Sequence, residues 1–228
     1  MVLPTDWLAL LAVVFLLGMR HGFDLDHLAA IDSLTRLNLN ANRNISRWAG
    51  FLFAFGHGLV VILVALVTAF LAKDIHPPRW LESTGAWISI VSLFALGSLN
   101  LIAVWGAQPG QIVRPKGLKA RWIDKLGTAT RPRHIILIGA LFALSFDTFT
   151  LAVLFSLTAL SIAGAYFVAA LGIIFMLGMM LTDGVNGLWV ARLLQRADAL
   201  AARASRAIAI VIGTLSLSLA MLGLARLY

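Results

Sequence analysis

The sequence predicts an all-α, polytopic membrane protein with six transmembrane helices. Of its 228 residues, 61% are hydrophobic and only 12% are charged, whereas soluble domains carry about 25% charged residues. The mean hydropathy of +0.93 agrees with this class. Six apolar stretches also reach the roughly 20 residues that a membrane span needs. No Ser/Gly linker or charge block divides the chain, so we expect a single domain over residues 1–228.

The first predicted span runs from Thr5 to Arg36 and is longer than one bilayer thickness. It is therefore either tilted or broken near Gly18 and Gly22, and Thr5 or Asp6 is placed to cap its first turn. The other five spans are expected over Trp48–Ala72, Ser83–Trp105, His134–Leu160, Gly164–Val190 and Ala207–Leu227.

The basic residues predict how the chain crosses the membrane. Most of the 18 lysines and arginines lie in three predicted loops on one side, residues 36–47, 114–133 and 192–206. The opposite side receives Lys73, Arg79 and Arg226. Cytoplasmic loops are enriched in such cations, so we expect those three loops inside and both termini outside. The same loop cations account for the net charge of +8. The partner that this charge implies is therefore the lipid bilayer rather than a nucleic acid.

A weak internal repeat divides the chain into halves, 1–110 and 134–228, joined by the basic loop. Phe23-Asp24-x-x-x-Leu28-Ala29 aligns with Phe146-Asp147-x-x-x-Leu151-Ala152. Three helices in each half would make the repeats inverted, which in transporters places the site near the membrane midplane. Chance agreement between apolar sequences is the alternative.

The most unusual stretch is Arg20-His21-Gly22-Phe23-Asp24-Leu25-Asp26-His27, which follows an apolar run. Ionisable groups inside a membrane are costly and typically functional. At helical spacing His21, Asp24 and His27 fall within an arc of about 120°, which predicts a shared metal-binding face. Asp26 falls elsewhere, where it would pair with Arg20 or accept a hydrogen bond from an imidazole. The alternative is a wet interfacial loop after a short helix.

The second predicted span carries one ionisable residue, His57, in Phe55-Gly56-His57-Gly58. Alone it would be a hydrogen-bonded core residue, but beside the first cluster we favour it as a third nitrogen ligand. The chain has no cysteine, so any metal must be held by imidazole, carboxylate, amide or thioether groups.

Four polar residues of the later spans are candidates for a second shell or a pathway: Asn100, Asp147, Asp183 and Asn186. Asn100 serves equally well as a bond between helices or as a cavity lining. A bare carboxylate at the position of Asp147 costs about 3 kcal/mol or more and should meet a cation, a proton or a donor. Asp183 could instead be an interfacial acid at a helix end. Met179 and Met180, just before it, are expected to be packing residues.

These motifs resemble the nickel/cobalt transporter (NiCoT) family. The run from Arg20 to Asp32, with its His21-x-x-x-x-Asp26-His27 core, resembles the family signature. In the family's order there follow motifs similar to its own around His57, Asn100, Ser145-Phe146-Asp147-Thr148 and Gly178-Met179-x-x-x-Asp183-x-x-Asn186.

The resemblance implies a non-enzymatic secondary transporter in the cytoplasmic (inner) membrane of a prokaryote. Ni²⁺ or Co²⁺ would be its transported substrate, with no prosthetic group. It also implies that the histidines and the aspartates of the first motif are critical to uptake. The chain departs from the family in having six predicted spans rather than eight and Asn186 where an acid is usual.

Three alternatives remain open at this stage. One is a metal effluxer, although the chain lacks the histidine-rich loop of related effluxers, which favours uptake. Another is an exporter of a small organic solute, as in the six-helix amino-acid exporters. The third is a metal sensor or accessory membrane subunit that does not itself transport. The chain has no placed nucleophile or cofactor fingerprint, so an enzyme is not expected.

Overall fold

The computed structural model describes residues 6–71, 79–108, 113, 131–144, 156, 164–196 and 199–227. Within these ranges every regular element is a helix, which confirms the all-α prediction. The elements are α1 (Trp7–His21), α2 (Leu25–Ala41), α3 (Arg43–Leu71), α4 (Arg79–Trp105), α6 (Pro132–Phe142), α8 (Ala165–Gln195) and α9 (Ala199–Leu227).

The number of spans among the described residues is smaller than six. Four helices are long and apolar enough to cross a membrane, and the bent pair α1–α2 would make a fifth. The predicted span from His134 to Leu160 is described only as the short apolar helix α6 and as Ser156. Asp147, the second-half repeat match around it and most of the basic loop 114–133 lie outside the described residues. Six spans and an inverted repeat therefore remain predictions.

The first predicted span is broken rather than tilted. α1 ends at His21, and α2 begins at Leu25 with its axis bent by 58°. Gly22 closes α1 by donating its N–H to the carbonyls of Gly18 and Arg20. At the other end Asp6 caps α1, because its carboxylate accepts the Ala9 N–H at 3.1 Å. A break near Gly22 and a cap by Asp6 were both expected.

The loop predicted after the first span is almost absent, because α2 runs to Ala41 and α3 starts at Arg43. Arg36 is 2% exposed and pairs with Asp32 at 2.7 Å. Its guanidinium also donates to the carbonyl of Val113 and the hydroxyl of Ser205. The prediction that Arg36 is a loop cation was therefore wrong: an acid one turn away and acceptors from other segments hold it inside.

The predicted loop 192–206 is shorter than expected for a similar reason. α8 extends to Gln195 and α9 starts at Ala199, so Arg192, Arg203 and Arg206 lie on helices. Those residues still lie near helix ends, where cations flank a span.

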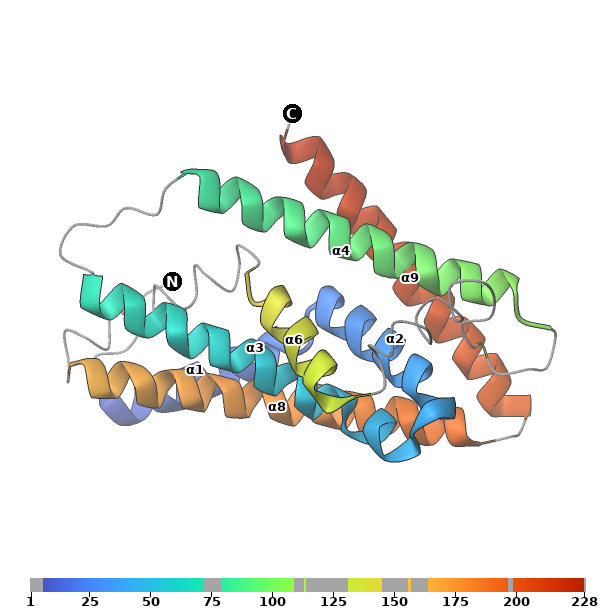
Figure 1. Cartoon of the computed structure of the whole chain (residues 1–228), viewed down its shortest axis with the longest axis horizontal. Coiled ribbons are helices and arrows are strands. Elements are labelled where there is room, and N and C mark those ends of the chain that lie inside the picture. Colours follow the sequence, from blue (N-terminus) through green and yellow to red (C-terminus); the bar gives the residue numbers. More distant parts are fainter. Residues whose placement is uncertain are drawn as a thin grey trace.

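The helices form two groups with α2 between them (Figure 1). α8 packs along both α1 and α3, and α3 also packs on α6, while α4 pairs with α9. α2 touches members of both groups: α3 and α8 on one side, α4 and α9 on the other. The half-helix after the break is thus enclosed, which explains why so many of its polar residues are buried.

Small residues bring the backbones around this half-helix close together. A Cβ on Gly18 would meet the carbonyl of Phe175, and a Cβ on Gly178 would meet the carbonyl of Phe15, so α1 and α8 touch through glycines on both sides. Such close approach drives helix association in lipid, where hydrophobic burial contributes little.

Candidate metal centre

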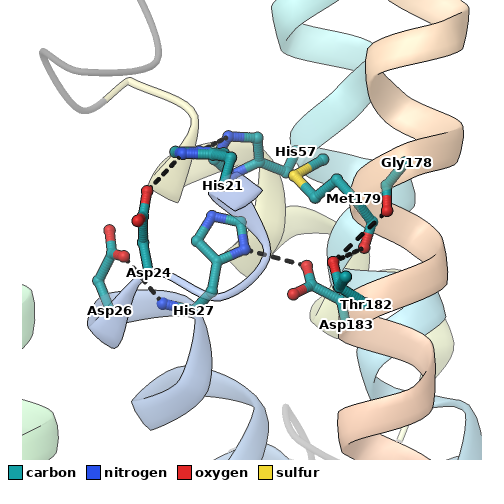
Figure 2. Close-up of polar contacts among 9 residues, drawn as sticks. All are labelled: His21, Asp24, Asp26, His27, His57, Gly178, Met179, Thr182 and Asp183. Carbon is teal, nitrogen blue, oxygen red and sulfur yellow. Dashed lines mark hydrogen bonds and ion pairs between the residues drawn. The ribbon is translucent and has the colours of Figure 1, made fainter. Parts of the chain in front are cut away.

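Three histidines meet where α1, α2 and α3 converge (Figure 2). His21 is the last residue of α1, His27 lies in the first turn of α2, and His57 lies in the middle of α3. One possible ligand atom from each lies within 4.8 Å of the other two, and all three residues are buried. They form a group of imidazole donors suited to a metal ion.

The break between α1 and α2 allows this convergence. A single straight helix would carry His21, Asp24 and His27 up one side, as the sequence spacing suggested. The 58° bend instead turns the first turn of α2 back, so the rings of His21 and His27 lie with centroids 4.6 Å apart. The ring of His57 is 5.2 Å from the first and 4.7 Å from the second.

Asp24 holds the ring of His21. Its Oδ2 lies 2.7 Å from Nδ1 of His21. In the tautomer that donates Nδ1–H to this carboxylate, Nε2 keeps its lone pair for a metal. That Nε2 lies 3.3 Å from Nε2 of His57. Donor nitrogens bound to one ion at about 2.1 Å lie about 3.0–3.4 Å apart, so this pair already has ligand spacing.

Asp183 holds the ring of His27 in the same way. Its Oδ2 lies 2.9 Å from Nδ1 of His27, and both side chains are fully buried. Nε2 of His27 is buried and has no hydrogen-bond partner among the described residues. A buried polar atom without a partner is costly, and here it belongs to a nitrogen beside two other imidazoles. The arrangement is suited to binding a cation.

Charge at the break also suits a cation. The C-terminal end of α1 carries the partial negative charge of the helix dipole. The N-terminal end of α2 would oppose this, but Asp24 and Asp26 sit on it, and Asp26 accepts the backbone N–H of His27 at 2.9 Å. The negative charges of Asp24 and Asp26 therefore offset the partial positive charge of the α2 N-terminus, which would repel a cation.

Aromatic rings close the group on two sides. Phe53 lies 5.0 Å from the ring of His27, and Phe175 lies 5.7 Å from the ring of His21. Both phenylalanines are fully buried. Apolar walls lower the local dielectric and strengthen the attraction between donors and a cation.

Three other predicted site residues, Arg20, Asn100 and Asn186, lie on α1, α4 and α8. Arg20 is exposed, and no ion pair among the described residues joins it to Asp26. Asn100 is buried on α4, and Asn186 is half-buried on α8, one turn beyond Asp183. Neither has a recorded contact with the histidines within the described part of the chain, and Asp147 lies outside that part.

The sequence made Asp183 a candidate for a second shell or a pathway, but it gave no sign of the bond to His27. Phe53 and Phe175 were not expected at the site. Spacing holds one usable signal: Phe175, Met179 and Asp183 recur every four residues on α8 and so share a face. The partner of that face, across 156 residues of chain, could only come from the structure.

Comparison with known proteins indicates the family of this chain. The family model of the NicO proteins, described as high-affinity nickel-transport proteins, matches residues 7–227. The nickel transporter NicT of Mycobacterium tuberculosis is 32% identical over 202 residues, covering 76% of this chain and 54% of that protein. The nickel transporter NixA of Staphylococcus aureus is 32% identical over 203 residues, covering 77% of this chain and 59% of that protein.

A cobalt transport protein, NhlF of Rhodococcus rhodochrous, is 29% identical over 208 residues, covering 79% of this chain and 58% of that protein. The chain thus spans only a little over half the length of these relatives. No solved structure matches it.

Proposed function

The chain belongs to the NicO family of high-affinity nickel-transport proteins, and from this premise we propose that it carries Ni²⁺, Co²⁺ or both across a membrane as a secondary transporter. The observation that carries the proposal is the buried group of His21, His27 and His57. Imidazole nitrogen suits both ions.

In this proposal the ion is held by the Nε2 atoms of the three histidines. Asp24 and Asp183 fix the rings of His21 and His27 by accepting their Nδ1 protons. Such carboxylates raise the basicity of the imidazole and set its direction. Asp24, expected from the sequence to be a ligand, thus acts through His21, with its side chain 47% exposed.

The rest of the chain would form the route for the ion. We propose that the stretch from His134 to Leu160 forms the sixth span, and that the halves 1–110 and 134–228 form the inverted repeat. Asn100, Asp147 and Asn186 would line the path, and Arg20 and Asp26 would stand at its edge. The membrane would be the cytoplasmic (inner) membrane of a prokaryote, with the basic helix ends inside and both termini outside.

The proposed direction is uptake, which the membrane potential can drive. A potential of 100 mV, negative inside, supplies about 2.3 kcal/mol per elementary charge, and therefore about 4.6 kcal/mol for a divalent ion. Uptake without a second ion is therefore energetically feasible.

Accumulation of radioactive nickel in cells expressing the protein tests the proposal. We expect His21→Ala, His27→Ala and His57→Ala each to abolish accumulation at equal expression. The matched control is His134→Ala, because His134 lies on α6 and outside the histidine group. Accumulation at the level of the parent in the three variants would refute the site. Faster loss of nickel from preloaded cells that express the protein than from cells that lack it would show efflux instead of uptake.

Titration calorimetry with the purified protein separates metal transport from export of an organic solute. We expect heat of binding with Ni²⁺ and Co²⁺ and none with lysine. Binding of lysine without binding of either metal would favour an amino-acid exporter.

A further inference from the structure

The face of α8 that meets the histidines carries a methionine between its two known contacts. Phe175 packs beside His21, and Asp183 bonds to His27. Met179 lies one turn from each on the same face. All three side chains are fully buried.

The neighbours of α8 define the direction of Met179 independently. Thr182 faces Gly22, which follows α1, and Met176 faces Gly58 on α3. At 100° per residue Met179 lies about 60° from each, between these two contacts. That direction leads into the space where α1, α2 and α3 bring their histidines together, and Figure 2 shows the sulfur of Met179 extending from α8 on that side.

We propose that the thioether sulfur of Met179 is a fourth donor of the metal centre and contributes to its choice of ion. This inference rests on the proposed function, since it concerns the same ion. Three imidazoles alone rank divalent ions by their general affinity for nitrogen. A thioether is a soft, polarisable donor. It favours Ni²⁺ and Co²⁺ over Mn²⁺ and Mg²⁺, which prefer oxygen.

Packing alone accounts less well for this position. The sequence favoured a packing role for Met179, and it does contact the apolar core between α1, α3 and α8. Yet its direction is shared with Asp183, a residue that bonds to a histidine, and the group it faces already contains an imidazole nitrogen without a partner, Nε2 of His27.

X-ray absorption at the nickel edge, on purified protein loaded with one equivalent of Ni²⁺, tests the proposal. The variant is Met179→Leu, which removes the sulfur and nearly conserves the volume. The matched control is Met180→Leu, the next residue of α8, which points about 100° away and packs against the same core.

We expect imidazole and sulfur shells in the parent and in the control, and the imidazole shell alone in Met179→Leu. The preference for Ni²⁺ over Mn²⁺ in competition should also be smaller in the variant than in the parent, because the three imidazoles still favour Ni²⁺. A parent spectrum with imidazole but no sulfur would overturn the role of Met179 and leave the histidine site intact. A spectrum without imidazole would overturn both.

Selenomethionine labelling gives a second measurement that requires no substitution. In the labelled parent the sulfur shell should become a heavier selenium shell at the nickel edge. An unchanged spectrum would overturn the proposal even if Met179→Leu failed to fold.

Discussion

Asp183 and His27 are separated by 156 residues of chain, and Oδ2 of the first lies 2.9 Å from Nδ1 of the second, with both side chains fully buried. This contact joins the half-helix α2 to α8. It also turns Nε2 of His27 toward the other two histidines. The carboxylate of Asp183 therefore orients one of the three histidines and is not itself a member of the histidine group.

Replacement of Asp183 by asparagine should weaken nickel binding. The amide keeps an acceptor for Nδ1 but removes the negative charge that makes the ring a stronger base. Loss of such a partner typically costs about 10–100-fold in metal affinity. Titration calorimetry of Asp183→Asn measures this, with Thr214→Ala on the exposed face of α9 as the control. Unchanged affinity would show that the bond does not orient the ligand.

Replacement of Asp24 by asparagine should weaken binding less than the change at Asp183. Asp24 makes the equivalent bond to His21, but its side chain is 47% exposed, and water screens its charge. The same calorimetric titration compares the two variants directly. An equal or larger loss at Asp24 would mean that its carboxylate touches the ion itself, as the sequence first suggested.

Replacing only Arg36 of the Arg36–Asp32 ion pair should destabilise the protein strongly, whereas replacing both residues should cost much less stability. Arg36→Met leaves the buried carboxylate of Asp32 uncompensated, and such single losses cost about 3–5 kcal/mol. The double change Asp32→Leu with Arg36→Met should recover much of this, since no charge is stranded. Thermal unfolding in detergent, followed by circular dichroism, measures both.

Arg47→Ala is the control for that series, because Arg47 bonds to Gln195 at the exposed surface. Its unfolding temperature should stay near that of the parent, within an effect of about 0.5 kcal/mol. If Arg36→Met is no less stable than Arg47→Ala, the buried network does not join α2 to α9 as described.

Gly139→Ala should disturb the contact between α6 and α3. The added Cβ would meet the backbone carbonyl of Phe53, which cannot move aside without shifting a helix, and overpacking of this kind costs about 1–3 kcal/mol. Gly106→Ala is the control, since its nearest neighbours lie at 3.5 Å or more. Equal unfolding temperatures for the two variants would contradict the close approach of α3 and α6.

Helix class, the break near Gly22 and the three histidines could be predicted from the sequence, for physical reasons that act locally. Apolar runs of membrane length have few alternatives to a helix. A glycine beside a dense ionisable cluster marks a point where a span is interrupted. His57 stands alone in its span, which made it conspicuous.

The remainder depends on contacts between distant segments. Arg36 looked like a loop cation because the sequence does not show that Asp32, Ser205 and Val113 would enclose it. For Asp183 a second shell and a pathway both stayed open, because nothing local reveals its bond to His27. The arc of His21, Asp24 and His27 assumed a straight helix, and the 58° bend changed their relation.

Anomalous diffraction at the nickel edge, from crystals of the protein grown with Ni²⁺, tests the central claim most directly. We expect one strong peak among the three histidines, about 2.0–2.2 Å from a nitrogen of His21, His27 and His57. A peak that touches only one of these rings, or lies elsewhere in the helices, would contradict it.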